Sequence, residues 1–201
     1  MGKVFDEIDD KLAGWISQQH LFFVGTAPAG GGSINVSPKG MGGTFAVLGP
    51  TRVGYLDYTG SGTETIAHLR QNGRIVLMFC AFDGPPRIVR LHGTGRAVLA
   101  GDDEFPALRT SFGKNRALGQ RSIIVVELTR ISDSCGYAVP LMDFRGDRDV
   151  LDRDQSRRDE DYFPRYWQQK NALSIDGIPG VPGAPAGGPN DAPTESTVRT
   201  G

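Results

Sequence analysis

The chain has 201 residues, a length that favours one domain with a substantial core over two full domains. Its 22 lysine and arginine residues nearly balance its 23 aspartate and glutamate residues, and a formal net charge of −1 argues against a nucleic-acid-binding surface. No run approaches the roughly 18 to 20 apolar residues that a membrane-spanning helix needs, and the charged N-terminus lacks the apolar core of a secretory signal. We therefore expect a cytoplasmic protein without a membrane or nucleic-acid partner.

The first part of the chain predicts one helix followed by short strands and turns. Phe5, Ile8, Leu12, Trp15 and Ile16 recur at helical spacing and predict an amphipathic first helix. The strands predicted after it cover residues 21–26, 34–37, 44–48 and 52–58.

The middle of the chain predicts one helix and two long strands. Residues 62–72 predict a helix that ends at Gly73. The continuous apolar run at 75–82 is typical of a strand buried on both faces. Residues 87–99 predict another strand, and Gly93 and Gly95 within it indicate a bulge or a bend.

The last third predicts two helices around one more strand. A helix is predicted over residues 101–112, with Asp102 as its candidate N-cap. A strand is predicted at 123–131, and the charged stretch that begins at Asp152 and ends in aromatic residues predicts a late helix.

Residues 177–201 are rich in glycine and proline and predict a disordered tail. Residues 1–176 then form a single domain, in which six or so strands are mostly linked by turns and the helices lie at the periphery. This order predicts a mainly β protein built as a closed or partly closed antiparallel barrel. It argues against a doubly wound parallel sheet, in which strands and helices alternate throughout.

Three segments could carry chemistry, and the first is Ser37-Pro38-Lys39-Gly40 at the end of a predicted strand. A hydroxyl, a point cation and a flexible glycine backbone together suit a phosphate or another anion. The alternative interpretation is a strand-ending turn with a solvated lysine.

The second segment, residues 58–65, reads Tyr-Thr-Gly-Ser-Gly-Thr-Glu-Thr and leads directly into a predicted helix. Backbone N–H groups at a helix start, with hydroxyls beside them, form a natural anion site. The spacing matches neither the Walker pattern nor a dinucleotide fingerprint. A simple capped turn is the alternative.

The third segment, residues 87–93, alternates in a way that places Ile88, Arg90 and His92 on one face of a strand. One face would pack the barrel, and the other would offer a cation and an imidazole, or would simply face solvent. The three histidines of the chain are scattered without metal-ligand spacing, so no metal site is predicted. The residues also give no clear catalytic constellation.

In this order and spacing, the three segments resemble the pyridoxamine 5'-phosphate oxidase-like family of FMN-binding split barrels, and its short bacterial members most of all. The resemblance runs from about residue 4 to residue 178 and is strongest over residues 34–98. It implies an antiparallel split β-barrel and a homodimer with FMN at the interface. It also implies a flavin-dependent oxidoreductase that passes hydride through the flavin N5 to or from a small molecule.

The resemblance also implies which residues lie near the cofactor, with the face that bears Ile88 and Arg90 approaching it from a partner chain. These residues are Ser37, Lys39, Gly40, Tyr58, Thr59, Gly60, Ser61, Thr63, Thr65, Arg87, Ile88 and Arg90.

The chain departs from the family pattern at several of these positions. Thr63-Glu64-Thr65 stands where the true oxidase has Ser-Arg-Lys, and Ile88 stands where that enzyme has a flavin-contacting glutamine. Oxidation of pyridoxamine phosphate itself is therefore not expected. The alternatives are a deazaflavin-dependent reductase, a non-enzymatic flavin or haem carrier on the same barrel, and an interaction module with a vestigial pocket.

Overall fold

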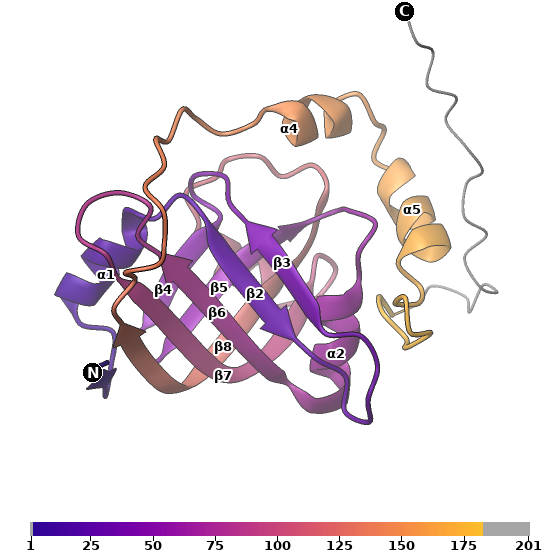
Figure 1. Ribbon diagram of the computed structural model, residues 1–201. Helices are drawn as coiled ribbons and strands as arrows, with labels where there is room; N and C mark the ends of the chain where they lie inside the picture. The colour runs from indigo at the N-terminus through magenta and orange to yellow at the C-terminus, as the bar shows by residue number, and fades with distance from the viewer. Residues whose placement is uncertain (1, 183–201) are drawn as a thin grey trace, which may run out of the picture.

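The computed structural model describes residues 2–182, which form one antiparallel eight-stranded sheet coiled into a barrel that stays open along one side (Figure 1). The strands are β1 (Val4–Phe5), β2 (Phe22–Thr26), β3 (Asn35–Lys39), β4 (Phe45–Gly49), β5 (Arg52–Tyr58), β6 (Arg74–Cys80), β7 (Ile88–Leu99) and β8 (Gln120–Ser134). Their order in the sheet is β3-β2-β6-β7-β8-β5-β4, and β1 pairs with β8. In the described chain β3 does not pair with β4, so the predicted antiparallel split β-barrel is confirmed.

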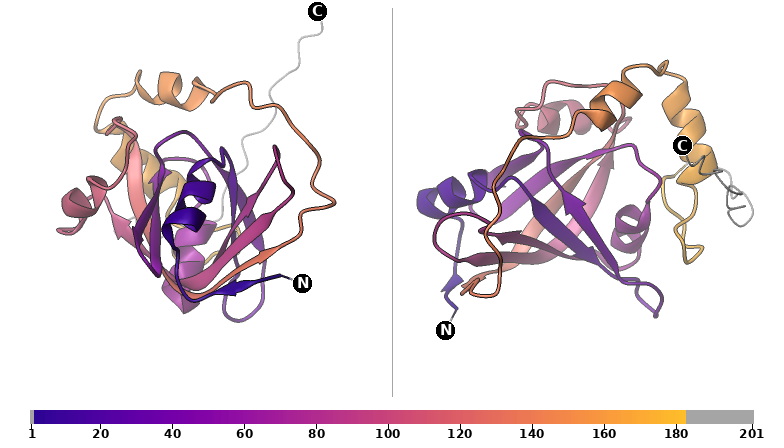
Figure 2. Two further views of the ribbon diagram at one scale, coloured as in Figure 1. Left: turned by 90° about the vertical axis from the view of Figure 1, so that its left-hand side faces the viewer. Right: turned by 45° about the horizontal axis from the view of Figure 1, so that its top comes forward.

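Five short helices lie around the barrel, as expected of a mainly β protein. They are α1 (Asp10–Ser17), α2 (Glu64–Asn72), α3 (Phe105–Arg109), α4 (Val150–Gln155) and α5 (Tyr162–Lys170). Figure 2 shows α1 at one end of the barrel, with α2 and α5 toward the other. Within residues 2–182, no helix is both long and apolar enough to cross a bilayer.

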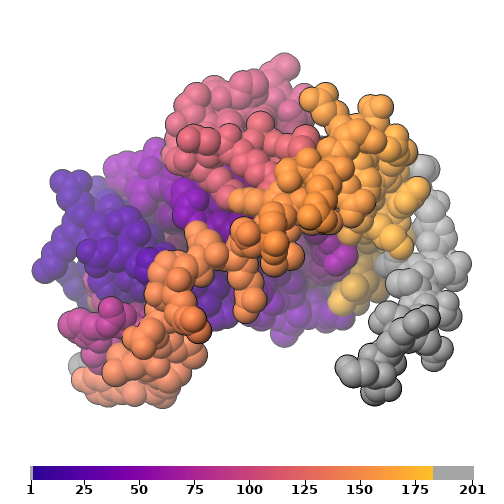
Figure 3. Space-filling view, turned by 90° about the horizontal axis from the view of Figure 1, so that it is seen from above, coloured from indigo at the N-terminus to yellow at the C-terminus, as the bar shows by residue number. Residues whose placement is uncertain are grey.

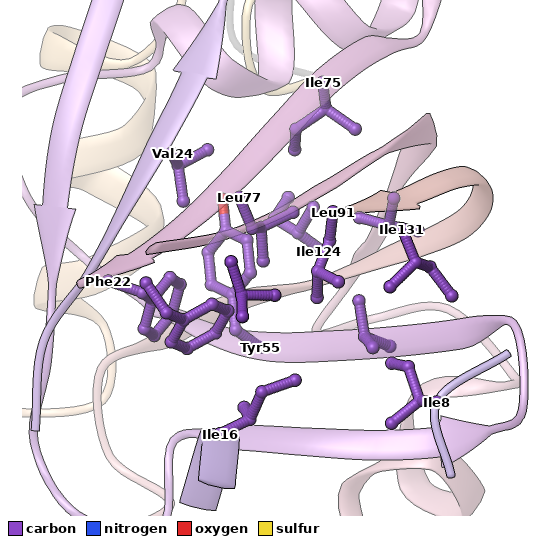
Figure 4. Packing of buried hydrophobic residues seen from close by; sticks show 14 of the residues in the cluster. Ile8, Ile16, Phe22, Val24, Tyr55, Ile75, Leu77, Leu91, Ile124 and Ile131 are labelled. Carbon is purple, nitrogen blue, oxygen red and sulfur yellow. The ribbon is translucent and has the colours of Figure 1, made fainter. Parts of the chain in front are cut away.

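The barrel interior is filled by alternate residues of the strands, because successive side chains of a strand point to opposite faces. Phe22, Val24, Leu77 and Leu91 are at most 3% exposed, and Ile16 closes the α1 end (Figure 4). Burying one such side chain contributes about 1.5–3 kcal/mol. A second apolar cluster packs α3 against the other face of β5 and β8.

The strand predicted at residues 75–82 is β6, but the prediction that both its faces are buried is wrong for the single chain. Leu77 and Phe79 are buried, whereas Val76 and Met78 are only half-buried. One face of β6 fills the barrel, and the other belongs to the outer face of the sheet. When both faces of a strand carry apolar residues, the sequence cannot distinguish a strand buried on both faces from one buried on a single face.

The helix predicted over residues 101–112 is much shorter, and Asp102 does not cap it. Oδ2 of Asp102 accepts from the Leu99 N–H over 2.8 Å and so stabilises the turn after β7. The N-cap position of α3 is Glu104. The predicted late helix is two helices, α4 and α5, separated by a charged turn.

The prediction for the start of the chain is wrong, and the prediction of a bulge in the long strand β7 is confirmed. Val4 and Phe5 form β1 rather than the start of the first helix. The bulge predicted in residues 87–99 is confirmed, since the register of β7 shifts between His92 and Gly93. A Cβ atom at Gly93 would lie 2.2 Å from the Glu127 carbonyl oxygen, so only glycine fits this close approach.

After β8 the chain crosses the barrel as an extended strap, residues 135–149, and then forms α4 and α5 (Figures 1 and 3). The C-terminal segment, residues 171–182, returns to α2. There Val181 is 7% exposed and its N–H donates to the Asn171 carbonyl over 2.9 Å. Gly180 and Val181 of the predicted tail are therefore packed on the domain, and residues 183–201 lie outside the described residues.

Candidate functional site

Polar side chains at the open side of the barrel connect the edge strand β3 with β5 and with the start of α2. Asn35, Ser37 and Lys39 face inward, because they pair with buried residues of β2. Lys39 Nζ lies 3.4 Å from Oδ1 of Asp57 on β5, and Asn35 Nδ2 donates to Thr65 Oγ1 at the start of α2 over 3.1 Å. We call this group the split cluster; its members are Asn35, Ser37, Lys39, Tyr55, Asp57 and Thr65.

Asp57 is the charged centre of the split cluster and is 4% exposed. Its Oδ2 accepts from Arg121 Nε over 2.8 Å and from Ser122 Oγ over 3.1 Å. Burial alone would raise the pKa of this carboxyl, but the charges of Arg121 and Lys39 hold that pKa below its ordinary value. Asp57 is therefore ionised at neutral pH and holds Lys39 at the split.

The Tyr55 hydroxyl is buried beside this charge. Tyr55 is fully buried, and its hydroxyl lies beside Asp57 and close enough to the Thr65 hydroxyl to interact with it, but it makes no hydrogen bond of good geometry among the described residues. Burial, reinforced by the charge of Asp57, raises the pKa of Tyr55 well above its ordinary value, so the phenol stays protonated. A buried hydroxyl without a well-formed hydrogen bond is costly and suits a site that receives a ligand.

The loop before α2 is held by its carbonyl groups. Arg121 Nη1 donates to the carbonyls of Gly60 and Gly62 over 3.3 and 2.9 Å, and Asn171 Nδ2 donates to those of Gly60 and Ser61 over 3.0 and 3.1 Å. Thr63, at the N-cap, makes no side-chain capping bond in the described structure. The amide groups of the first turn of α2 therefore have no acceptor from the capping residue.

Two carboxylates lie near the same helix start. Glu64 Oε1 accepts from the Ile175 N–H over 3.3 Å, and the Asp176 carboxylate accepts from the N–H and hydroxyl of Ser33 over 2.7 and 2.9 Å. The C-terminal segment thus binds the first carboxylate through Ile175 and carries the second, Asp176, which Ser33 binds. An anion at this helix start would experience their repulsion as well as the attraction of Lys39.

The structure brings six of the twelve predicted residues to the split or to the loop beside it: Ser37, Lys39, Gly40, Gly60, Ser61 and Thr65. Thr63 adjoins them, but its side chain is buried under Gly180.

Five predicted residues lie elsewhere in the single chain. Tyr58 and Thr59 are buried away from the split, where their hydroxyls donate to the carbonyls of Arg116 and Gly119 over 2.8 and 2.9 Å. Arg87 pairs with Asp133 at 2.9 Å, beside the start of β7 and three strands along the sheet from β3.

Ile88 and Arg90 point out of the barrel, as their alternation with buried Val89 predicted. Strand register places Pro38, Phe23, Met78 and Arg90 in one row on this outer face. Lys39 lies on the opposite face. One copy of the chain therefore cannot present Lys39 and Arg90 to the same small ligand.

Sequence reasoning missed the residues that organise the site: Asp57, Arg121 and Asn171. A signal existed for the first two, since Asp57 interrupts an apolar strand and Arg121 precedes the apolar run of β8. Charged residues in such runs are almost always paired when buried. Asn171 follows α5, and no local pattern connects it with the loop before α2.

An open antiparallel barrel with a polar cluster at the split, beside a helix start, defines the split-barrel class of small-ligand proteins. The family model described as pyridoxamine 5'-phosphate oxidase matches residues 8–135. A pyridoxamine 5'-phosphate oxidase family protein of Aspergillus flavus is 39% identical over 191 residues, covering 88% of this chain and 77% of the relative. The chain belongs to the pyridoxamine 5'-phosphate oxidase family, as its motifs indicated.

Two solved structures are similar to this chain at low sequence identity. A HupZ variant from Group A Streptococcus is 20% identical with a TM-score of 0.52, and the match covers 63% of this chain and 99% of that one. A FAD-binding protein from Mycobacterium smegmatis is 15% identical with a TM-score of 0.43, over 65% of this chain and 97% of that one. The first of these similarities supports the split-barrel fold.

Proposed function

We propose that the protein is a flavin-dependent oxidoreductase that binds FMN by its phosphate at the split cluster and acts on a small organic molecule. Membership of the family supports a flavin. The observation that carries the proposal in this chain is the split cluster itself, where the charge of Lys39, the buried Tyr55 hydroxyl and the Thr65 hydroxyl lie beside the uncapped start of α2.

The donors at the split fit the needs of a phosphate. Ser37, Ser61 and Thr65 offer hydroxyls, Lys39 offers a charge, and the loop before α2 offers amide groups. Each hydrogen bond to a charged group contributes about 1.5–3 kcal/mol, and micromolar affinity requires about −8 kcal/mol. A few such bonds together with burial of a flat ring reach that value, despite the repulsion from Glu64.

The ring end of the cofactor needs a second copy of the chain. Because Lys39 and Arg90 lie on opposite faces of the sheet, a site containing both has to form between two protomers. The outer face and its edge strand are suited to such pairing, since Ile34 and Val36 are 77% and 64% exposed. We therefore propose a homodimer with the cofactor at its interface.

Bound FMN supplies a hydride acceptor or donor at its N5, and the protein positions the partner molecule and tunes the electrostatics of the ring. The residues of this chain then bind and orient: Lys39 and the loop before α2 fix the phosphate, and Asp57 fixes Lys39. No side chain has to transfer a proton for this chemistry. Pyridoxamine phosphate is not the proposed substrate, because Thr63 and Glu64 replace residues that the true oxidase uses.

Replacing Lys39 tests the phosphate contact. Lys39→Ala should weaken FMN binding about 10- to 100-fold, the effect of losing one charge-assisted hydrogen bond, when the dissociation constant is measured by flavin fluorescence quenching. Lys11→Ala, on an exposed position of α1, is the matched control and should bind FMN as the unmodified protein does. Equal dissociation constants for the two variants would remove Lys39 from the site.

A further inference from the structure

A hollow of about 540 Å³ opens at the α1 end of the barrel. Its floor is aromatic: Phe22, Phe45 and Phe79 pack with ring centroids 5.1–5.4 Å apart. Ala13 and Ile16 of α1 form one wall. Hollows of this size and apolar character are typical of small-molecule sites in proteins, whose volumes are about 300–1,000 Å³.

The strap forms the roof of this hollow. The ring of Phe144 stacks on His20, with centroids 3.6 Å apart and planes 6° from parallel. The other side of the stacked pair lines a second hollow of about 610 Å³. Two hydrogen bonds hold the strap on either side of Phe144: the Met142 N–H donates to the Phe82 carbonyl, and the Gly42 N–H donates to Asp147 Oδ2, both over 2.8 Å.

The opposite wall is the loop that follows β3. Met41 has a φ of 70°, in the left-handed region that non-glycine residues rarely adopt, and it is the one such residue in the described chain. The Thr44 hydroxyl donates to the carbonyls of Gly40 and Met41 over 2.8 and 2.9 Å and holds this conformation. Hydrogen bonds within the loop and to Asp147 therefore hold this wall of the hollow in place.

The charges around the hollow select the kind of ligand. Asp147 is its one carboxylate, and no lysine or arginine lies among its described lining residues. Gly42 occupies Oδ2 of Asp147, which leaves Oδ1 able to accept a further hydrogen bond. An anionic group is disfavoured here, which separates this hollow from a phosphate site.

We propose that this hollow binds a small, planar, aromatic molecule that is neutral or cationic and carries an N–H or amino donor. The ring lies between the aromatic floor and the stacked pair of His20 and Phe144, and the donor faces Asp147. The hollow includes Gly40, the residue after Lys39, so this ligand lies next to the split cluster. The inference that this ligand is the substrate rests on the proposed function. The inference that the hollow binds it does not.

The test uses indole and its isostere benzofuran, which lacks the N–H donor, on the 201-residue chain freed of any co-purified chromophore. We expect indole to bind, shifting the amide resonances of residues 40–44 in a heteronuclear NMR titration, and benzofuran to bind about tenfold more weakly. Absence of indole binding at millimolar concentration, or shifts confined to other segments, would overturn the proposal.

Two strap variants localise the binding. Phe144→Ala should weaken indole binding at least fivefold, whereas Leu141→Ala, at a position 79% exposed on the same strap and outside both hollows, should not change it. Ala13→Phe should fill the hollow and weaken indole binding. It tests the same site if Phe144→Ala folds poorly. Equal affinity in all three variants would contradict the proposal.

The flavin is tested separately, because indole binding is measured without it. If Lys39→Ala loses FMN but still binds indole, both sites stand as proposed. If the protein binds indole and never binds FMN, the proposed function fails and the aromatic site remains.

Discussion

Asp57 is the residue that connects the split with the loop before α2. It holds Lys39 from one oxygen and Arg121 from the other, and Arg121 in turn holds two carbonyls of that loop. Both Asp57 and Arg121 are nearly fully buried. The pair therefore positions two parts of the proposed phosphate site at once.

Replacing Asp57 should cost stability in a pH-dependent way. Asp57→Asn leaves Arg121 buried without its counter-charge, so we expect unfolding free energy at pH 7 to fall by about 3 kcal/mol or more. The folded-state pKa of Asp57 is lowered, so its contribution is fully present above the ordinary carboxyl pKa of about 4. That contribution is lost as pH falls through the lower folded-state value.

Urea unfolding at neutral and at acid pH checks this expectation. The difference between Asp57→Asn and the unmodified protein should shrink as the solution is acidified, whereas the exposed control Asp103→Asn should show almost no difference at either pH. A deficit that stays the same at both pH values would mean that Asp57 stabilises the fold without its charge.

At the level of elements, strands were predicted well and helices less well. The barrel strands stand out as short apolar or alternating runs between turn residues, so their existence followed from the sequence, and the glycines of β7 indicated its bulge. The helix around α3 was overestimated because Phe105 and Phe112 both pack on β5 and β8, although only the first lies in a helix. Side chains spaced for a helix can also reach one surface from a turn.

The C-terminal segment shows what no local pattern could predict. It contributes one buried apolar residue, Val181, and otherwise attaches by polar contacts: Arg70 donates to the Gly180 carbonyl over 2.6 Å, and Asn171 binds the loop before α2. Such contacts leave no periodicity in the sequence. For the same reason the site residues Asp57 and Arg121 could be suspected from the sequence, while Asn171 could not.

Truncation measures how much this attachment contributes. Removing residues after Ile178 deletes Gly180 and Val181 with their contacts to α2, so we expect the melting temperature to fall by several degrees. Removing residues after Pro182 keeps these contacts and should leave the melting temperature nearly unchanged. Equal melting temperatures for the two truncated proteins would show that the segment adds no stability.

At the scale of the whole molecule, the order of the elements and the three motifs were enough to predict an antiparallel split barrel of this family. Alternation predicted the face of the β7 motif, whereas the face of the β3 motif was not predicted. Strand register places the β3 motif inside the split and the β7 motif on the outer face. The resemblance implied one cofactor site that the β7 motif approaches from a partner chain, and in a single chain the two motifs do lie on opposite faces of the sheet.

A crystal structure of the protein soaked in FMN tests the central claim most directly. We predict electron density for the phosphate within hydrogen-bond distance of Lys39 Nζ and the first-turn amides of α2, with the ring against Arg90 of the partner subunit. A phosphate bound away from Lys39 and α2, or a split that excludes FMN, would contradict the account.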